Sequence, residues 1–142
     1  MIEVYKYEET DLDRMTFNRW AWPLKSKKQI KFIKKYLLQA FAFTVYDVTK
    51  DKPVAIIAFH FYGKGIAYGM LIGDKEYSKN PKYTIVTKCF WEKLIKNYKI
   101  EYAQTVSEDT PELNKWHEFL GFHKEKSLPG HLRGRDFILW SM

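Results

Sequence analysis

The hydrophobic and polar positions at the start of the chain predict a strand followed by a helix. Ile2–Tyr7 carries apolar and polar side chains in turn, which is typical of a half-buried strand. Glu8–Asp11 then offers N-capping side chains, so we expect a helix from Asp11 towards Trp22 that stops before Pro23.

A second helix is predicted after Ser26, whose side chain can cap about 13 residues. Ile30, Ile33 and Leu37 recur at i, i+3 and i+7, while lysines gather on another side of the same segment. We interpret the basic side as the solvated surface of a core-packed helix. A surface for phosphate or an acidic substrate is the alternative.

Three consecutive strands are predicted in the middle of the chain. Phe41–Val48 and Pro53–Tyr62 are rich in β-branched and aromatic residues and flank a polar turn, so they predict an antiparallel hairpin. Ile66–Ile72 follows the turn Gly63–Gly65 as the third strand.

Helices and strands alternate in the second half. A helix is predicted over residues 83–98, and the strand Ile100–Val106 follows closely enough to pair in parallel with an earlier strand. We interpret Cys89 as a small core residue of that helix. The predicted apolar stripe of the helix over residues 83–98 is Val86, Cys89, Phe90 and Leu94.

The last predicted helix begins with Thr110 as N-cap and Pro111 as first helical residue, and it ends at Gly121. Two terminal strands, 122–128 and 136–142, are predicted around a turn at Pro129-Gly130. The element order is that of a mixed α/β fold in a single domain over residues 1–142. In the last predicted helix, which begins after Thr110, the side chains expected to be buried are Leu113, Trp116 and Leu120.

Composition narrows the function classes. The formal charge of +7 and pI near 9.3 favour anionic partners, although few of the basic residues are the arginines that specific base recognition uses. A single cysteine excludes a disulfide-stapled fold, and the acidic N-terminus is unlike a signal peptide, so we expect a cytoplasmic protein without a membrane segment. The histidines and Cys89 show no metal-binding spacing, and no metal is expected.

The segment Thr110–Phe122, Thr-Pro-Glu-Leu-Asn-Lys-Trp-His-Glu-Phe-Leu-Gly-Phe, resembles the last conserved segment of the Gcn5-related N-acetyltransferases (GNAT), an Asn and a helix followed by Tyr-Glu-x-Leu-Gly-Phe. The ending Leu120-Gly121-Phe122 matches outright. Residues Glu3–Asp13 are similar to the first strand of that family and its turn into the first helix. The element order matches the family fold across nearly the whole chain.

The resemblance implies a mostly antiparallel sheet that opens between its fourth and fifth strands, where acetyl-CoA binds and gives its acetyl group to an amine of a small molecule or protein. In the family a tyrosine three residues before the Leu acts as the acid, and this chain has His117 there. A histidine can carry a proton near neutrality. An exposed polar helix residue is the alternative.

The expected cofactor site departs from the family in one respect. The family's glycine-rich pyrophosphate loop corresponds here to Asp74–Tyr83, which contains no glycine. The alternative is a solvated loop that leads into the next helix. The residues expected at acetyl-CoA are the backbone of Met70, Leu71 and Ile72, the side chains of Lys75, Ser78, Lys79, Asn80 and Lys82, and Thr110 in place of the family's Asn.

Degenerate loops of this kind occur in phage branches of the superfamily. A second hypothesis is therefore a phage-type protein that keeps the fold without catalysis and binds a protein or a nucleic acid. Interleaved aromatic and basic residues around Trp20 and the following lysines are also used by single-strand binders, but no recognised nucleic-acid motif is present.

The resemblance also suggests where the acceptor binds. His60 lies in the apolar strand that would pass behind the acceptor pocket, so His60 can bind or deprotonate an amine, and a partly buried structural histidine is the alternative. The acceptor and the oligomeric state are not predicted. The further acceptor-binding candidates are Arg19, Trp20, Tyr62 and Glu108.

Overall fold

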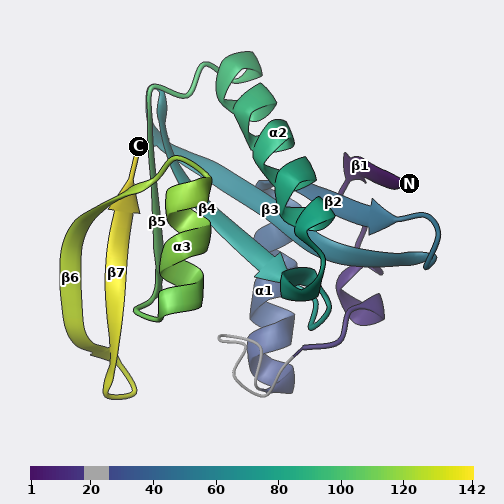
Figure 1. Cartoon of the computed structure of the whole chain (residues 1–142), viewed down its shortest axis with the longest axis horizontal. Helices are drawn as coiled ribbons and strands as arrows, with labels where there is room; N and C mark the ends of the chain where they lie inside the picture. Colours follow the sequence, from purple (N-terminus) through teal and green to yellow (C-terminus); the bar gives the residue numbers. More distant parts are fainter. Residues whose placement is uncertain (18–25) are drawn as a thin grey trace. The chain divides into compact units, whose positions relative to one another are not determined.

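The computed structural model describes residues 1–17 and 26–142. The described strands form one seven-stranded mixed sheet in the order β1-β2-β3-β4-β5-β7-β6, and the mixed α/β class is confirmed (Figure 1). The elements are β1 (Ile2–Lys6), α1 (Lys27–Gln39), β2 (Phe41–Asp47), β3 (Lys52–Gly63), β4 (Ile66–Gly73), α2 (Pro81–Asn97), β5 (Tyr102–Glu108), α3 (Pro111–Phe119), β6 (His123–Leu132) and β7 (Arg135–Ser141).

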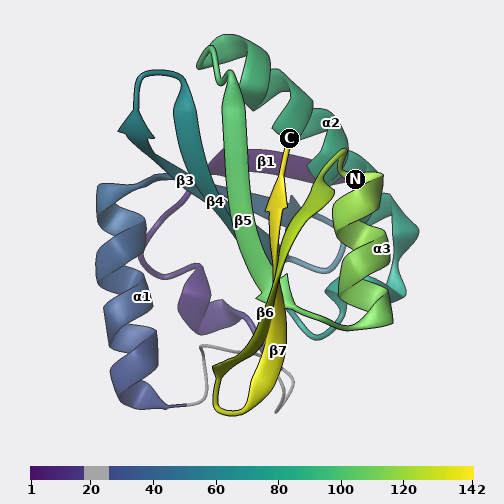
Figure 2. The same cartoon turned by 90° about the vertical axis from the view of Figure 1, so that its left-hand side faces the viewer.

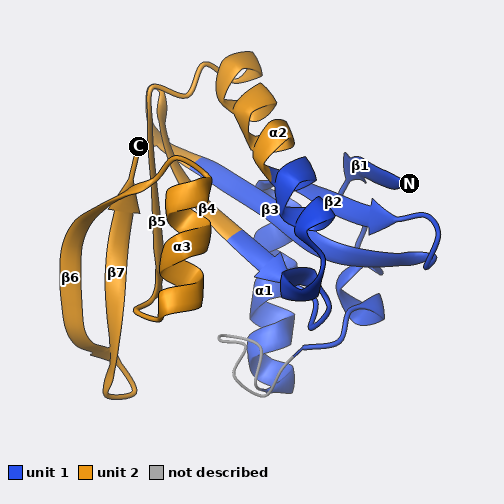
Figure 3. Ribbon diagram, viewed as in Figure 1, with its two compact units in different colours: residues 1–60, 71–87 blue, residues 61–70, 88–142 orange. Residues whose placement is uncertain are grey.

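The chain divides into two compact units (Figure 3). Unit 1 comprises residues 1–60 and 71–87, and unit 2 comprises residues 61–70 and 88–142. The chain passes from one unit to the other within β3, β4 and α2.

Unit 1 is built on antiparallel strands. β1 pairs with β2 and β2 with β3, and α1 contacts β2. The predicted second helix is confirmed: the Ser26 hydroxyl accepts the N–H of Gln29, and Ile33 and Leu37 are its buried side chains. β3 supplies the longest buried apolar run, Val54 to Phe59, which explains why its sequence shows no polar alternation.

The helix predicted from Asp11 is wrong in its described part. Only a 3-10 turn forms over Leu12–Arg14, and Met15 is extended with φ −94° and ψ 149°. The buried carboxylate of Asp11 accepts the Glu8 N–H at 2.9 Å and the Thr44 hydroxyl at 2.7 Å. These bonds fix the turn against β2, where an isolated sequence pattern suggested a helix.

Unit 2 contains the parallel and the C-terminal antiparallel pairs. β4 runs parallel to β5, as predicted, while β7 lies antiparallel between β5 and β6. Figure 2 shows the long β6–β7 hairpin, with β6 in yellow-green and β7 in yellow. α3 begins as predicted, because the Thr110 hydroxyl accepts the N–H of Leu113 and Pro111 follows it.

The buried side of α2 differs in part from the prediction: Leu94 is buried as predicted, whereas Val86 and Phe90 are half-buried. Cys89 is exposed and is not a core residue. The buried side chains are Tyr83, Thr87, Trp91 and Leu94, at i, i+4, i+8 and i+11. The hydroxyl of Thr87 donates to the Tyr83 carbonyl at 2.8 Å. Because this buried residue is polar, the helical spacing of apolar residues did not identify the buried side of α2.

Two predictions near the C-terminus are also corrected. In α3 the buried residue is His117, whereas Leu113 is 39% exposed and Trp116 half-buried. The predicted burial of Leu120, directly after the helix, is confirmed. The hairpin turn lies at Arg133-Gly134, both with positive φ, because Leu132 pairs with Arg135. Pro129 lies inside β6, which is an edge strand of the sheet.

Two features are absent from the part of the chain that the structure describes. None of the helices over residues 1–17 and 26–142 combines the length and apolar character needed to cross a membrane. Within the same residues, no group of three or more His, Cys, Asp and Glu side chains is arranged to hold a metal ion.

Candidate active site

The loop between β4 and α2 is anchored in unit 1 by the carboxylate of Asp74. Its side chain is fully buried and accepts the N–H of Thr16 at 2.7 Å and of Glu76 at 2.9 Å. The Lys52 ammonium lies 3.1 Å from the same carboxylate. The Asp74 N–H itself donates to the Val54 carbonyl at 2.8 Å. The loop therefore leaves the strand in a fixed direction.

Tyr83 provides a second anchor at the start of α2. Its buried phenol donates to the Asp47 carboxylate at 2.5 Å. Burial and this carboxylate raise the pKa of Tyr83 to about 12, while the hydrogen bond lowers the pKa of Asp47. The first turn of α2 is thereby held on β2.

Polar side chains surround the N-terminus of α2 without any glycine. The Asn80 side chain accepts the N–H of Lys82 at 3.0 Å, and Lys79 lies 3.6 Å from Glu76. A helix N-terminus attracts anions, and exposed ammonium groups add to that field. The predicted residues Lys75, Ser78, Lys79 and Lys82 are exposed, and Asn80 is half-buried.

The predicted backbone segment at the end of β4 falls on both sides of the unit boundary. Leu71 and Ile72 belong to unit 1, where Ile72 is buried and Leu71 half-buried. Met70 belongs to unit 2. In unit 2, β4 pairs with β5 over Ile66–Tyr68, and Met70 follows the last pair, Tyr68 with Gln104, by two residues.

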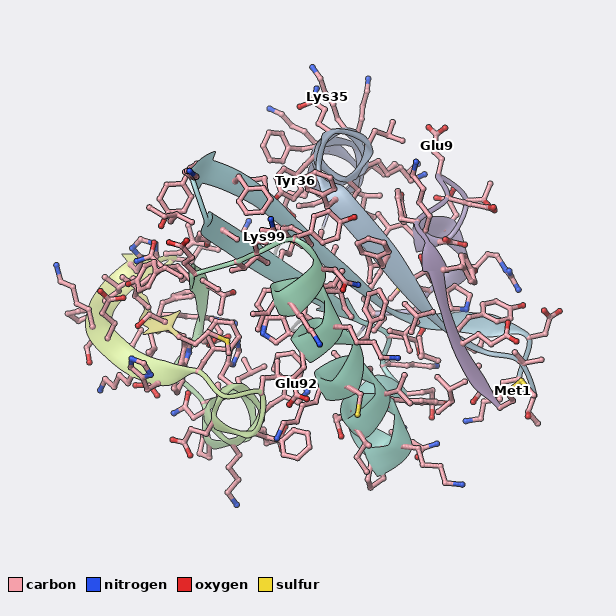
Figure 4. The ribbon with its side chains drawn as sticks, turned by 90° about the horizontal axis from the view of Figure 1, so that it is seen from above. Met1, Glu9, Lys35, Tyr36, Glu92 and Lys99 are labelled. Carbon is pink, nitrogen blue, oxygen red and sulfur yellow. The ribbon has the colours of Figure 1, made fainter. Side chains whose placement is uncertain are left out.

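His60 has a structural partner within unit 1. Its Nδ1 lies 2.7 Å from the Tyr36 hydroxyl, and the two rings meet edge to face at 5.6 Å. Figure 4 labels Tyr36 on α1. His60 is half-buried, so its position fits a histidine held by α1. The predicted acceptor residues Arg19 and Trp20 lie outside the described residues.

His117 lies in the aromatic core of unit 2 and is 6% exposed. Its ring stacks on Trp140 at 5.2 Å and meets Phe122 edge to face at 6.0 Å. Its Nδ1 lies 2.7 Å from the Leu113 carbonyl, which can only accept, so Nδ1 carries the proton and neutral His117 has its lone pair on Nε2. Burial lowers the pKa of His117.

The remaining predicted residues of unit 2 have separate partners. Glu108 forms an ion pair with Arg135 at 3.5 Å, and Thr110 caps α3. Tyr62 is 52% exposed and donates to the side chain of Gln104 on β5. Tyr62 is therefore part of a hydrogen-bonded surface, whereas Glu108 and Thr110 have structural partners.

No family model and no curated protein match the chain. Solved structures do. A ribosomal-protein alanine acetyltransferase from Vibrio fischeri superposes with a TM-score of 0.77 at 18% identity, over 99% of this chain and 92% of that one. A Bacillus anthracis acetyltransferase of the GNAT family has a TM-score of 0.76 at 12% identity, over 99% of this chain and 93% of that one. The chain has the GNAT acetyltransferase fold.

A third structure with the GNAT fold is a spermidine N-acetyltransferase chimera from Vibrio cholerae and hSSAT. Its TM-score is 0.78 at 13% identity, over 99% of this chain and 94% of that one. The predicted fold is thus confirmed by comparisons that each cover 99% of this chain. Likeness at such low identity concerns the GNAT fold, and the chemistry has to be argued from the residues.

Sequence reasoning missed two groups of polar residues. Asp74 follows β4 directly, and an acid at the end of a buried strand was the available signal. Tyr102, Gln104 and Glu125 lie on β5 and β6 and meet in unit 2. Gln104, an amide at an inner position of β5, was a local sign of that second group.

Proposed function

We propose that the protein is an acetyl-CoA-dependent N-acetyltransferase with an amine acceptor. The observation that carries this proposal is the set of exposed lysines at the N-terminus of α2, on a loop anchored by Asp74, in a chain with the GNAT fold. The transfer forms an N–C bond, breaks the C–S bond of a thioester and finally moves the amine proton to sulfur.

Lys75, Lys79 and Lys82 are the proposed ligands of the diphosphate of acetyl-CoA. Their exposed ammonium groups, with the positive end of the α2 dipole, fit two phosphate charges without the close backbone approach that glycines allow. Ser78 and Asn80 add polar side chains, and Met70, Leu71, Ile72 and Thr110 remain proposed cofactor contacts. Bound acetyl-CoA supplies an activated acetyl thioester.

His117 is the proposed proton-handling residue because of its place in the motif. Neutral His117 presents a lone pair at Nε2, and burial opposes a second proton. These observations support proton acceptance or packing and speak against the acid role. His60, bonded to Tyr36, has less support as a catalytic residue than as a structural one.

The acceptor is proposed from chemistry and from the names of the similar structures. Those proteins are named for acetylation of a ribosomal-protein alanine and of spermidine, and both names support an amine acceptor. Arg19, Trp20, Tyr62 and Glu108 remain proposed acceptor residues. A cytoplasmic location fits a protein with one cysteine and a CoA ester as co-substrate.

The decisive experiment is calorimetric titration with acetyl-CoA, with two charge-matched double variants of α2 and its preceding loop. K79E/K82E changes the N-terminal end, whereas K93E/K96E changes exposed lysines near the C-terminal end by the same charge. We expect saturable binding with a Kd that rises about tenfold or more in the first variant, because charge-assisted hydrogen bonds to phosphate no longer form. The second variant should change the Kd less than about twofold. Lys93 follows Lys82 by eleven residues of the same helix, about 16 Å at a rise of about 1.5 Å per residue, which exceeds the Debye length of about 8 Å.

Absence of acetyl-CoA binding by the wild-type protein would overturn the proposal. An equal loss of acetyl-CoA affinity in K79E/K82E and K93E/K96E would show that net charge causes the effect. It would contradict a diphosphate site at the N-terminus of α2. With binding in hand, turnover of primary amines by His117→Phe tests proton handling, and unchanged turnover removes that role from His117.

The alternative function is binding of single-stranded nucleic acid by unit 1 without catalysis. Residues 27–39 contain five lysines and no acid, and Phe32 is 70% exposed among them. Figure 4 shows Lys35 on the outer side of α1. Exposed aromatic rings between lysines suit base stacking and phosphate contact.

Salt-dependent anisotropy titration with a single-stranded RNA tests this alternative. K28E/K31E should lower the slope of log K against log salt by about 0.7 for each phosphate that the variant no longer neutralises, and Phe32→Ala should weaken binding without changing that slope. A complex of equal affinity in K93E/K96E and K28E/K31E would refute a specific role of α1.

A further inference from the structure

A hydrogen-bonded group of polar side chains lies on one face of the sheet in unit 2. The Tyr102 hydroxyl donates to Glu125 Oε2 at 2.8 Å, and Gln104 Nε2 contacts the same oxygen at 3.4 Å and the Tyr102 hydroxyl at 3.2 Å. Tyr62 joins through its hydroxyl, which donates to Gln104. Tyr62, Tyr102, Gln104 and Glu125 are called the Glu125 cluster below.

A β-bulge directs Glu125 into this cluster. In the β6–β7 ladder Lys124 pairs with Trp140 and Lys126 with Leu139, so Glu125 is the extra residue between two consecutive pairs. β7 separates β6 from β5 in the sheet, yet Glu125 reaches Tyr102 and Gln104 on β5. The bulge therefore turns a carboxylate of the edge strand over the sheet face.

The Glu125 carboxylate is stabilised in its charged form by neutral donors. Hydrogen bonds from Tyr102 first, and then from Gln104 and Ser141, lower the pKa of Glu125, and the electrostatic effect of His123 acts in the same direction. Glu125 forms no ion pair with any described residue, although Lys124 and Lys126 flank it. In a chain of charge +7, no Lys or Arg nitrogen of the described residues thus lies within 4 Å of this carboxylate.

The chemistry of the cluster suits an alkylammonium ion. A carboxylate attracts such an ion, and tyrosine rings beside it offer electron-rich faces. The cluster also lies where the parallel pairing of β4 and β5 ends, since Gln104 belongs to the last pair of that ladder. An amine that attacks a thioester must be neutral, so an ionised carboxylate fits a second, still protonated nitrogen of the acceptor.

We propose that the Glu125 cluster binds a protonated amino group of the acceptor, and that the acceptor is a small alkyl diamine or polyamine. This inference rests on the proposed N-acetyl transfer for its biological meaning. Glu125 holds one nitrogen, and the other reacts. Binding itself requires no acetyl-CoA, so it is measurable separately.

The test is NMR titration of the intact protein with 1,4-diaminobutane, with 1,4-butanediol and n-butylamine as comparison probes. The matched variants are Glu125→Gln and Glu118→Gln, since Glu118 is an exposed carboxylate on α3 of the same unit. We expect diamine binding to weaken about fivefold or more in Glu125→Gln and less than about twofold in Glu118→Gln. The diol should bind more weakly than the diamine to the wild-type protein.

Turnover separates recognition from chemistry. Glu125→Gln should raise KM for the diamine with little change in kcat or in KM for acetyl-CoA, because the second nitrogen is equally held before and during transfer. Tyr102→Phe keeps the ring and removes one donor, so a smaller rise in KM is expected.

Two results overturn the inference: diamine affinity in Glu125→Gln equal to wild type, or diol binding as tight as diamine binding. Either result, found together with saturable acetyl-CoA binding and turnover of n-butylamine, leaves the proposed function intact. Glu125-dependent diamine binding in a protein that does not bind acetyl-CoA supports the cationic site and refutes the transferase.

Discussion

Asp74→Asn should destabilise unit 1 by about 3 kcal/mol. The amide retains one acceptor oxygen, which serves best at the Oδ2 position, where Glu76 N–H and the Lys52 ammonium donate. The new NH2 group then faces the Thr16 N–H, which can no longer form its hydrogen bond of 2.7 Å to Oδ1. A bond to a charged group contributes about 2 kcal/mol, and the weakened contact with Lys52, itself a quarter exposed, adds about 1 kcal/mol.

Urea unfolding followed by circular dichroism measures this destabilisation. With a slope of about 2 kcal/mol per molar urea, the midpoint should fall by about 1.5 M. Asp13→Asn is the matched control, because its ion pair with Lys34 is solvent-exposed and should contribute less than about 1 kcal/mol. If both variants unfold at the same urea concentration, or if Asp74→Asn matches the wild type, Asp74 does not anchor the loop as described.

Two further predictions concern His117 and Cys89. Burial lowers the pKa of His117, so the unfolded chain binds more protons than the folded protein near and below pH 6.5. Between pH 7.5 and 5.5 the free energy of unfolding of the wild-type protein should therefore fall by up to about 1.4 kcal/mol more than that of His117→Phe. Urea titrations at the two pH values measure this difference, and equal losses in both proteins would contradict the burial of His117. Cys89 is exposed on α2, so Ellman's reagent should modify the folded protein at a rate close to that of the urea-unfolded chain, and protection of more than about a hundredfold would place the thiol in the core instead.

Elements governed by neighbouring residues could be predicted from the sequence. Ser26 caps α1 and Thr110 caps α3, and both bonds join residues three positions apart. The segment after Asp11 was mispredicted because its partners lie far along the chain: Thr44 bonds Asp11, and Asp74 takes the N–H of Thr16 across 58 residues. No local pattern contains that information.

The turn of the last hairpin shows a related limit. Gly130 and Gly134 both have positive φ, at 58° and 72°, so both satisfy the local requirement of a turn. Pairing between β6 and β7 decides that the chain reverses at Arg133-Gly134. Sequence preference alone could not distinguish the two positions.

The residues of the candidate site could be predicted only where they belong to the family motif or lie close together in the sequence. The motif position of His117 was identified, but its burial against Trp140 depends on β7 and could not be read from α3. The exposed lysines around the start of α2 were found because Lys75, Lys79 and Lys82 lie close together in the sequence. The Glu125 cluster was missed because its members come from three strands, and the bulge that turns Glu125 over the sheet face leaves no mark in the alternation of β6.

Pro129 and the irregular pairing of β6 also affect self-association. An edge strand offers free backbone groups to a second chain, and a regular one is a template for intermolecular sheets. In β6 the register shifts between Lys124 and Lys126 and again between Leu128 and Leu132, and Pro129 has no N–H to donate. A strand of a neighbouring molecule therefore cannot form a continuous hydrogen-bonded ladder with β6. This edge should not promote fibre formation at high protein concentration.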